Sequence, residues 1–139
     1  MVDSMKGNGD NWRGQAFEEM LFDYLDNGYL ENIITFFEHD PEQIYLIPKM
    51  IKDERIRIKV GAIAIIEEIK EKNPEVLKKI VPSLIDLLES SEKNIRGDAA
   101  YALEIIADPD SRDALLEALN KEQDTQVREF IEDALKSIT

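Results

Sequence analysis

Apolar residues recur at steps of three and four along most of the chain, which is the spacing of one face of an α-helix. Asp, Asn, Ser, Gly or Pro bound each of these periodic stretches, as expected at helix ends. The pattern predicts eight helices, naturally paired as four hairpins. They cover about residues 12–25, 29–38, 41–52, 54–71, 75–89, 92–107, 111–120 and 124–138.

The pattern gives no support for a β-sheet. No stretch alternates with a period of two, and no Asn-Gly or Asp-Gly turn separates two β-branched runs. The predicted fold class is therefore all-α. Residues 1–10 have no apolar periodicity and contain two glycines, so they are expected to form a disordered lead-in to a single domain at 11–139.

Internal similarity shows how the helices are organised. The segment Ile95–Ile106 aligns with Val127–Ile138, 32 residues further on, through an aliphatic-Arg pair, an Ala-Leu pair and a final Ile. A third copy begins at Ile58-Lys59, with Ile56-Arg57 as the alternative register. A single helical hairpin cannot bury both of its apolar stripes, so such copies are expected to stack around one continuous core.

The run IRGDAAYALEIIADPDSRDALLEALNKEQDTQVREFIEDALKSI resembles the HEAT-like repeats also found in phycobilisome lyase-type proteins. The resemblance implies a right-handed, ARM/HEAT-like α-solenoid (an alpha-alpha superhelix) of about four helical hairpins. It makes 41–139 the recognisable repeats and 11–40 a divergent N-terminal cap. It also implies that the cation at the head of each copy (Lys59, Arg96, Arg128) is structural and ties its repeat to a carboxylate in the preceding turn.

Aromatic residues gather at the N-terminal end of the chain, where the repeats are least regular. We interpret them as the core of the cap, with an exposed binding patch as the alternative. Eight of the ten lie in the first 45 residues: Trp12, Phe17, Phe22, Tyr24, Tyr29, Phe36, Phe37 and Tyr45.

Composition narrows the choice of partner. The formal net charge is −13, which repels phosphate backbones and anionic membranes, so neither a nucleic acid nor a membrane is an expected partner. No run of roughly 18 apolar residues is present, and residues 1–10 lack the apolar stretch of a secretory signal. We therefore expect a cytoplasmic protein.

Residues suited to catalysis are scarce. The chain has no cysteine and one histidine, His39, so we expect neither a metal site nor another cofactor. Adjacent carboxylates such as Glu67-Glu68 diverge by about 100° on a helix and do not form a catalytic pair by themselves. No phosphate-binding loop, Rossmann fingerprint or nucleophile elbow occurs. The sequence predicts a protein that is not an enzyme.

The resemblance implies that the second helix of each hairpin lines a concave face that contacts partners. We assign these helices to Gln43–Lys52, Val76–Glu89 and Ser111–Asn120, and we expect their exposed side chains to grade from basic to acidic along the solenoid. Phe130 aligns with Asp98 at an outward position, so either the last helix is tucked differently or Phe130 helps to pair two molecules, and the predicted state is a monomer or a weak homodimer. The candidate partner-binding residues are Tyr45, Lys49, Lys52, Lys79, Ser83, Asp86, Asp113 and Glu117.

The function favoured by the sequence is a non-catalytic scaffold or adaptor that presents this concave surface to a protein partner. A small regulatory or assembly factor is the alternative, including lyase-like chaperoning of a client or cofactor. A HEAT-like DNA glycosylase is a further alternative, but its groove has to be basic to hold DNA and the net charge opposes that.

Overall fold

The computed structural model describes the backbone of residues 2–138 and the side chains of residues 14–138. Every regular element in the described backbone is helical, which confirms the all-α prediction. The elements are α1 (Val2–Asp26), α2 (Leu30–His39), η1 (Pro41–Tyr45), α3 (Leu46–Ile51), α4 (Ile56–Lys72), α5 (Pro74–Leu77), η2 (Lys78–Ile80), α6 (Val81–Leu87), α7 (Lys93–Ile106), η3 (Pro109–Ser111), α8 (Arg112–Lys121) and α9 (Thr125–Ser137), where η marks a 3-10 helix.

Three of the predicted helices are composite. Those at 41–52, 75–89 and 111–120 begin with 3-10 or short α-helical turns before the main helix: η1 with α3, α5 and η2 with α6, and η3 with α8. Pro48 and Pro82 lie within the first turn of α3 and α6. A proline is tolerated there because the first-turn N–H groups have no partner within the helix.

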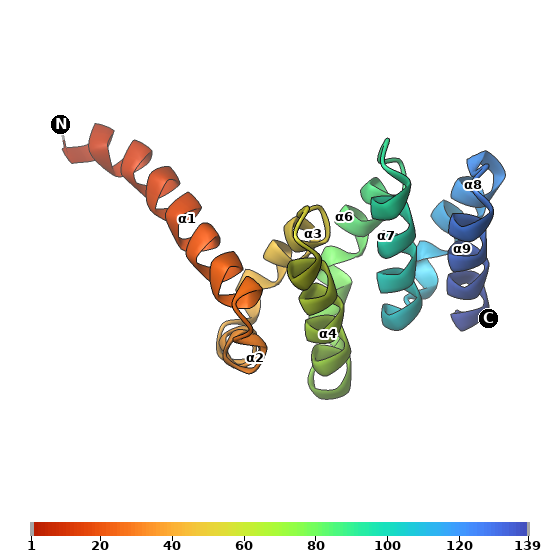
Figure 1. Ribbon diagram of the computed structural model, residues 1–139, viewed down its shortest axis with the longest axis horizontal. Helices are drawn as coiled ribbons and strands as arrows, with labels where there is room; N and C mark the ends of the chain where they lie inside the picture. Colours follow the sequence, from red (N-terminus) through yellow and green to blue (C-terminus); the bar gives the residue numbers. More distant parts are fainter. Residues whose placement is uncertain (1, 139) are drawn as a thin grey trace.

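The repeats form a two-layered solenoid (Figure 1). One layer holds α4, α7 and α9, which run in the same direction, with α7 in contact with both of the others. The other layer holds the composite helices that precede them, and each packs against its neighbour in the first layer. At the N-terminal end, α1 and α2 contact each other and α4.

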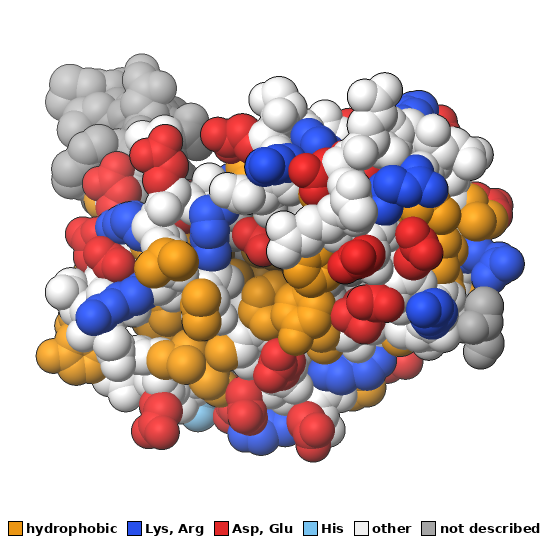
Figure 2. All heavy atoms as spheres, turned by 45° about the vertical axis from the view of Figure 1, so that its right-hand side comes forward, with side chains coloured by type: hydrophobic (Ala, Val, Ile, Leu, Met, Phe, Trp, Pro, Cys, Tyr) orange, Lys and Arg blue, Asp and Glu red, His pale blue; other side chains and the backbone are white. Residues whose placement is uncertain are grey.

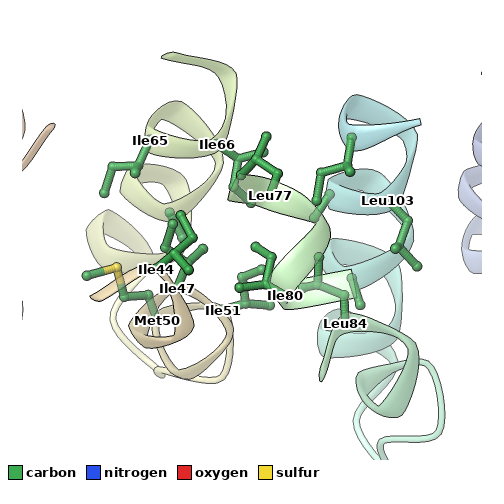
Figure 3. Packing of buried hydrophobic residues seen from close by; sticks show 14 of the residues in the cluster. Ile44, Ile47, Met50, Ile51, Ile65, Ile66, Leu77, Ile80, Leu84 and Leu103 are labelled. Atoms are coloured by element: carbon green, nitrogen blue, oxygen red, sulfur yellow. The ribbon is translucent and has the colours of Figure 1, made fainter. Parts of the chain in front are cut away.

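The hydrophobic core lies between the two layers and continues from one unit to the next. Figure 3 shows side chains of η1 and α3 meeting those of α4, α6 and α7, with Ile66 beside Leu77 and Ile80 near Leu84. Each fully buried Leu or Ile contributes roughly 1.5–3 kcal/mol of transfer free energy. Small residues of α7, such as Ala99 and Ala102, are also fully buried and allow close helix packing.

The head cation of each repeat donates to a main-chain carbonyl before it, in the last turn of a helix for Lys59 and Arg128 and in the turn after α6 for Arg96. The Lys59 ammonium donates to the carbonyl of Ile51 at 2.7 Å, the Arg96 guanidinium to Ser90 O at 2.9 Å, and Arg128 to Leu119 O at 2.7 Å. The exposed carbonyls at a helix end carry partial negative charge that a cation stabilises. Lys59 makes this bond while Ile58 is buried and Ile56 is 75% exposed, which supports the Ile58-Lys59 register.

The carboxylate that the resemblance implied lies after Arg96 in the chain, not before it. Arg96 binds Glu122 through two hydrogen bonds of 2.7 and 3.0 Å, and Glu122 is in the turn that follows, not the one that precedes. The expectation of a carboxylate partner in the preceding turn is wrong for Arg96, because Arg96 binds a main-chain carbonyl there. The hydrogen bond from Arg96 lowers the pKa of Glu122, whose side chain is 5% exposed.

The N-terminal phenylalanines and tyrosines differ in how deeply they are buried. Phe22 and Phe37 are buried, and Phe17 and Phe36 are half-buried with their ring centroids 5.5 Å apart. The tyrosines among them, Tyr24, Tyr29 and Tyr45, are exposed. A phenylalanine core therefore fills the N-terminal end, while the tyrosines lie on the surface. The side chain of Trp12 is outside the described residues.

Polar contacts join α1 to the first repeat. Lys49 of α3 pairs with Glu18 at 2.9 Å, and Arg55 pairs with Asp23 at 2.8 Å. The backbone of α1 continues to Val2, across the segment expected to be a lead-in. The division into a lead-in at 1–10, a cap at 11–40 and repeats at 41–139 stays a prediction.

Two glycines predict opposite effects of adding a methyl group. At Gly61, a Cβ would lie 2.7–2.9 Å from the buried Leu25 side chain, whereas at Gly97 the nearest atom is a ring carbon of Phe130 at 3.5 Å. We expect Gly97→Ala to raise the free energy of unfolding by about 0.5–1 kcal/mol through helix propensity. Gly61→Ala should lower it by about 1 kcal/mol through overpacking. Urea unfolding measures both; a gain from Gly61→Ala would contradict the close approach of α1 and α4.

The Arg96–Glu122 pair predicts a pH-dependent contribution to stability. Glu122→Gln should lower the free energy of unfolding by about 2 kcal/mol near neutral pH, because a charged, largely buried hydrogen-bond acceptor is lost. The folded-state pKa of Glu122 lies below its ordinary value of 4.5. The stabilisation is therefore present above that value and is lost as pH falls through the folded-state pKa.

Urea unfolding of the wild type and Glu122→Gln across this pH range tests the expectation. The matched control is Glu117→Gln, whose ion pair with Lys121 is exposed and should be worth less than about 1 kcal/mol. The gap between wild type and Glu122→Gln should narrow in acid. A gap that stays constant from neutral to strongly acidic pH would show that the charge of Glu122 does not stabilise the fold.

Candidate functional site: a groove across three parallel helices

A groove of about 790 Å³ crosses the outer face of α4, α7 and α9. Helix α4 forms one wall, α7 the middle, and α9 with the turn before it the other wall. The lining residues are Glu54, Ile56, Lys59, Val60, Ile63, Ala64, Glu67, Lys93, Asn94, Gly97, Asp98, Tyr101, Asp124, Gln126, Val127 and Phe130.

Large apolar side chains are exposed to solvent along this groove. Val60 is 63% exposed, Tyr101 is 36% exposed, and Ile63 and Phe130 are half-buried. The rings of Tyr101 and Phe130 meet edge to face, with centroids 6.1 Å apart. Figure 2 shows hydrophobic side chains gathered across the middle of this side of the molecule, with acidic side chains beside them. A contiguous, polar-rimmed apolar patch is typical of an interaction surface.

Ionic contacts fasten the helix beginnings at one end of the groove. The Lys59 ammonium lies 3.9 Å from a carboxylate oxygen of Asp98, and that of Lys93 lies 3.8 Å from Asp124. Burial raises the pKa of Asp98, and the neighbouring Lys59 lowers it by less. The backbone N–H of Val127, which Asp124 caps at 3.0 Å, lowers the pKa of Asp124.

Repeat position determines which side chains line the groove. Val60 and Gly97 follow their head cations by one residue, Asp98 and Phe130 by two, and Tyr101 by five. Of these residues Val60 and Tyr101 are exposed, Asp98 and Phe130 are half-buried, and Gly97 is buried. An apolar residue at an outward-facing repeat position is the sequence signal that could have located the groove. Of these residues, the sequence predicted an outward position only for Phe130.

The predicted partner-binding residues lie on the other layer. All eight are exposed. Lys49 is engaged with Glu18 at 2.9 Å and Glu117 with Lys121 at 3.2 Å. None of the eight lines the groove, so a role for them in binding stays a prediction. They are Tyr45, Lys49, Lys52, Lys79, Ser83, Asp86, Asp113 and Glu117.

A second hollow, of about 540 Å³, separates α6 from α8. Two of the predicted residues, Asp86 and Glu117, line it. So do Arg96 and Glu122, which are already paired with each other. The charged groups at the base of this hollow therefore serve the packing of consecutive repeats.

The described side chains contain no group of three or more His, Cys, Asp or Glu residues that could hold a metal ion. His39 is exposed at the end of α2, where its Nδ1 lies 2.9 Å from the carbonyl oxygen of Thr35. No described helix has both the length and the apolar character needed to cross a bilayer. The chemistry available in the groove is apolar contact and electrostatic attraction.

Comparison with known proteins identifies the repeat. A family model described as HEAT repeats matches residues 45–136, about two-thirds of the chain, from the end of η1 almost to the end of α9. No curated protein and no solved structure matches the chain. The matched region contains the three head cations and every residue of the groove, so the family assignment and the geometry concern the same part of the molecule. The chain belongs to the HEAT repeat family.

Proposed function

We propose that this protein is a non-catalytic scaffold that binds a protein partner in the groove across α4, α7 and α9. The observation that carries the proposal is the solvent exposure of Val60 and Tyr101, with Ile63 and Phe130 half-buried beside them, along one continuous groove. Exposing such side chains favours association, because covering them removes apolar surface from water.

The charges of the groove argue against DNA as its ligand. Its lining contains four carboxylates and two lysines, and both lysines already lie near carboxylates. A DNA-binding groove requires the opposite balance. This disfavours the glycosylase alternative. A scaffold and an assembly factor that holds its client transiently would use the same groove, and the lifetime of the complex separates them.

Photo-crosslinking tests which layer binds. We would place p-benzoylphenylalanine at Val60 in the groove or at Tyr45 on the other layer, two sites of similar exposure at 63% and 58%. We expect extract from the source cells to yield a specific adduct from the Val60 site alone. An adduct from the Tyr45 site alone would instead place binding on the layer predicted from the sequence.

The captured protein then has to pass a direct test. It would be identified by mass spectrometry, purified and titrated against the wild type and against Val60→Ser with Tyr101→Ser. We expect affinity to fall by roughly tenfold or more, since hot-spot apolar contacts commonly contribute that much. Failure to obtain an adduct from either site, or affinity unaffected by the double substitution, would contradict the proposal.

Self-association is the competing use of the groove, because Phe130 lines it. We propose that the chain is a monomer, since pairing would bring together two molecules that each carry a net charge of −13. Sedimentation over a range of concentrations should give the monomer mass for the wild type and for Phe130→Ser. A wild type that dimerises, beside a Phe130→Ser variant that does not, would assign the groove to a second copy.

A further inference from the structure

The two cations in the groove are engaged, whereas several of its acids are not. Lys59 donates to the carbonyl of Ile51 and lies near Asp98, and Lys93 lies near Asp124. By contrast, Glu54 in the turn before α4 and Glu67 on α4 form no ion pair with any described residue within 4.0 Å. The groove therefore presents uncompensated negative charge to an incoming partner.

The negative charge increases toward the carboxyl ends of the three helices. The helices α4, α7 and α9 run in the same direction (Figure 1), and Glu104 and Asp133 follow Tyr101 and Phe130 by three residues, which places them one turn further along the same helix faces. Burial and then the nearby Asp133 charge raise the pKa of Glu104. Among the described side chains, neither Glu104 nor Asp133 has an ion-pair partner within 4.0 Å. Carboxylates that raise one another's energy favour a cationic ligand.

The walls suit a helix better than an extended strand. All three walls are helical, and the described backbone offers no strand edge to which a partner strand could add. A helix can instead place residues spaced by three and four on an apolar floor such as Val60, Ile63, Tyr101 and Phe130. The volume of about 790 Å³ matches side chains from a few helical turns better than a whole domain.

We infer that the groove takes an amphipathic helix of a partner protein, with an apolar face on the floor and Lys or Arg residues against Glu67, Glu104 and Asp133. This inference rests on the proposed protein-binding function and specifies its ligand. The acidic net charge of the whole chain adds long-range attraction for such a helix. It also opposes occupation by a second copy of this chain.

Three synthetic peptides provide the test. Each is a fluorescein-labelled helix of about 18 residues with the same Leu and Ala face, and the polar face carries Lys, Gln or Glu. Fluorescence anisotropy with the full chain should give affinities in the order Lys, Gln, Glu. We expect a difference of roughly tenfold or more between the first and the last, reduced by added salt.

Matched variants locate the binding. Val60→Ser with Tyr101→Ser should weaken the Lys peptide by roughly tenfold or more, whereas Leu116→Ser, an exposed apolar site on α8, should leave it unchanged. Glu67→Gln, Glu104→Gln and Asp133→Asn together should weaken it several-fold. The control combines Glu31→Gln, Glu42→Gln and Glu71→Gln, exposed carboxylates outside the groove that give the same change in net charge. Circular dichroism checks that each variant remains folded.

The outcomes separate this inference from the function on which it rests. Equal affinity for the three peptides, lost in Val60→Ser with Tyr101→Ser, would overturn the basic helix and leave the groove as a binding site. If the control carboxylates matter as much as Glu67, Glu104 and Asp133, or if the apolar substitutions have no effect, the attraction is general and the inference fails. The inference also fails if no peptide binds. The crosslinking result then decides whether the groove binds a protein partner.

Discussion

The hydrogen bonds from Lys59, Arg96 and Arg128 to the carbonyls of the preceding turns set the geometry on which the structure depends. The bonds from Lys59 and Arg128 hold the first turn of a helix in one layer to the last turn of a helix in the other layer, and the bond from Arg96 reaches the turn after α6. Such a bond offsets the partial negative charge of main-chain carbonyls, so the two layers are joined where unsatisfied polar groups would otherwise meet. The outward-facing residues of α4, α7 and α9 are then aligned with one another, and the groove lies along them.

The local pattern of apolar and charged residues was sufficient to predict most of the fold. The steps of three and four predicted the helices, and the repeated aliphatic-cation pair predicted the stacking, because both follow from which residues need burial. The pattern did not reveal the 3-10 turns before α3, α6 and α8, since they depend on how the chain enters each layer. The family resemblance misplaced the carboxylate partner of Arg96. The contact with Glu122 joins neighbouring repeats, and a motif within one repeat contains no information about it.

The candidate site was harder to predict because exposure is a property of the assembled layers. The predicted residues, such as Tyr45 and Lys49, are exposed, but they were selected by assigning the binding face to the helices before the head cations. Val60 and Tyr101 look like ordinary core residues in the sequence, since Ala, Ile and Leu side chains neighbour them along the chain. Only their position relative to Lys59 and Arg96 shows that they point away from the core. The exposure of the tyrosines in the N-terminal cap could not be predicted from the sequence either, because it also depends on the assembled layers.

The position of Glu122 has a consequence for how the molecule comes apart. Its carboxylate holds Arg96, its backbone carbonyl receives Arg128, and one of its carboxylate oxygens accepts from the N–H of Asp124. A single residue in a loop thus fastens the last two units to each other, whereas most contacts in a solenoid couple only adjacent surfaces. Detaching α8 and α9 together would break the pair with Arg96, whereas separating α9 from α8 would break the bond from Arg128. The final units are therefore joined into one cooperative block instead of fraying helix by helix.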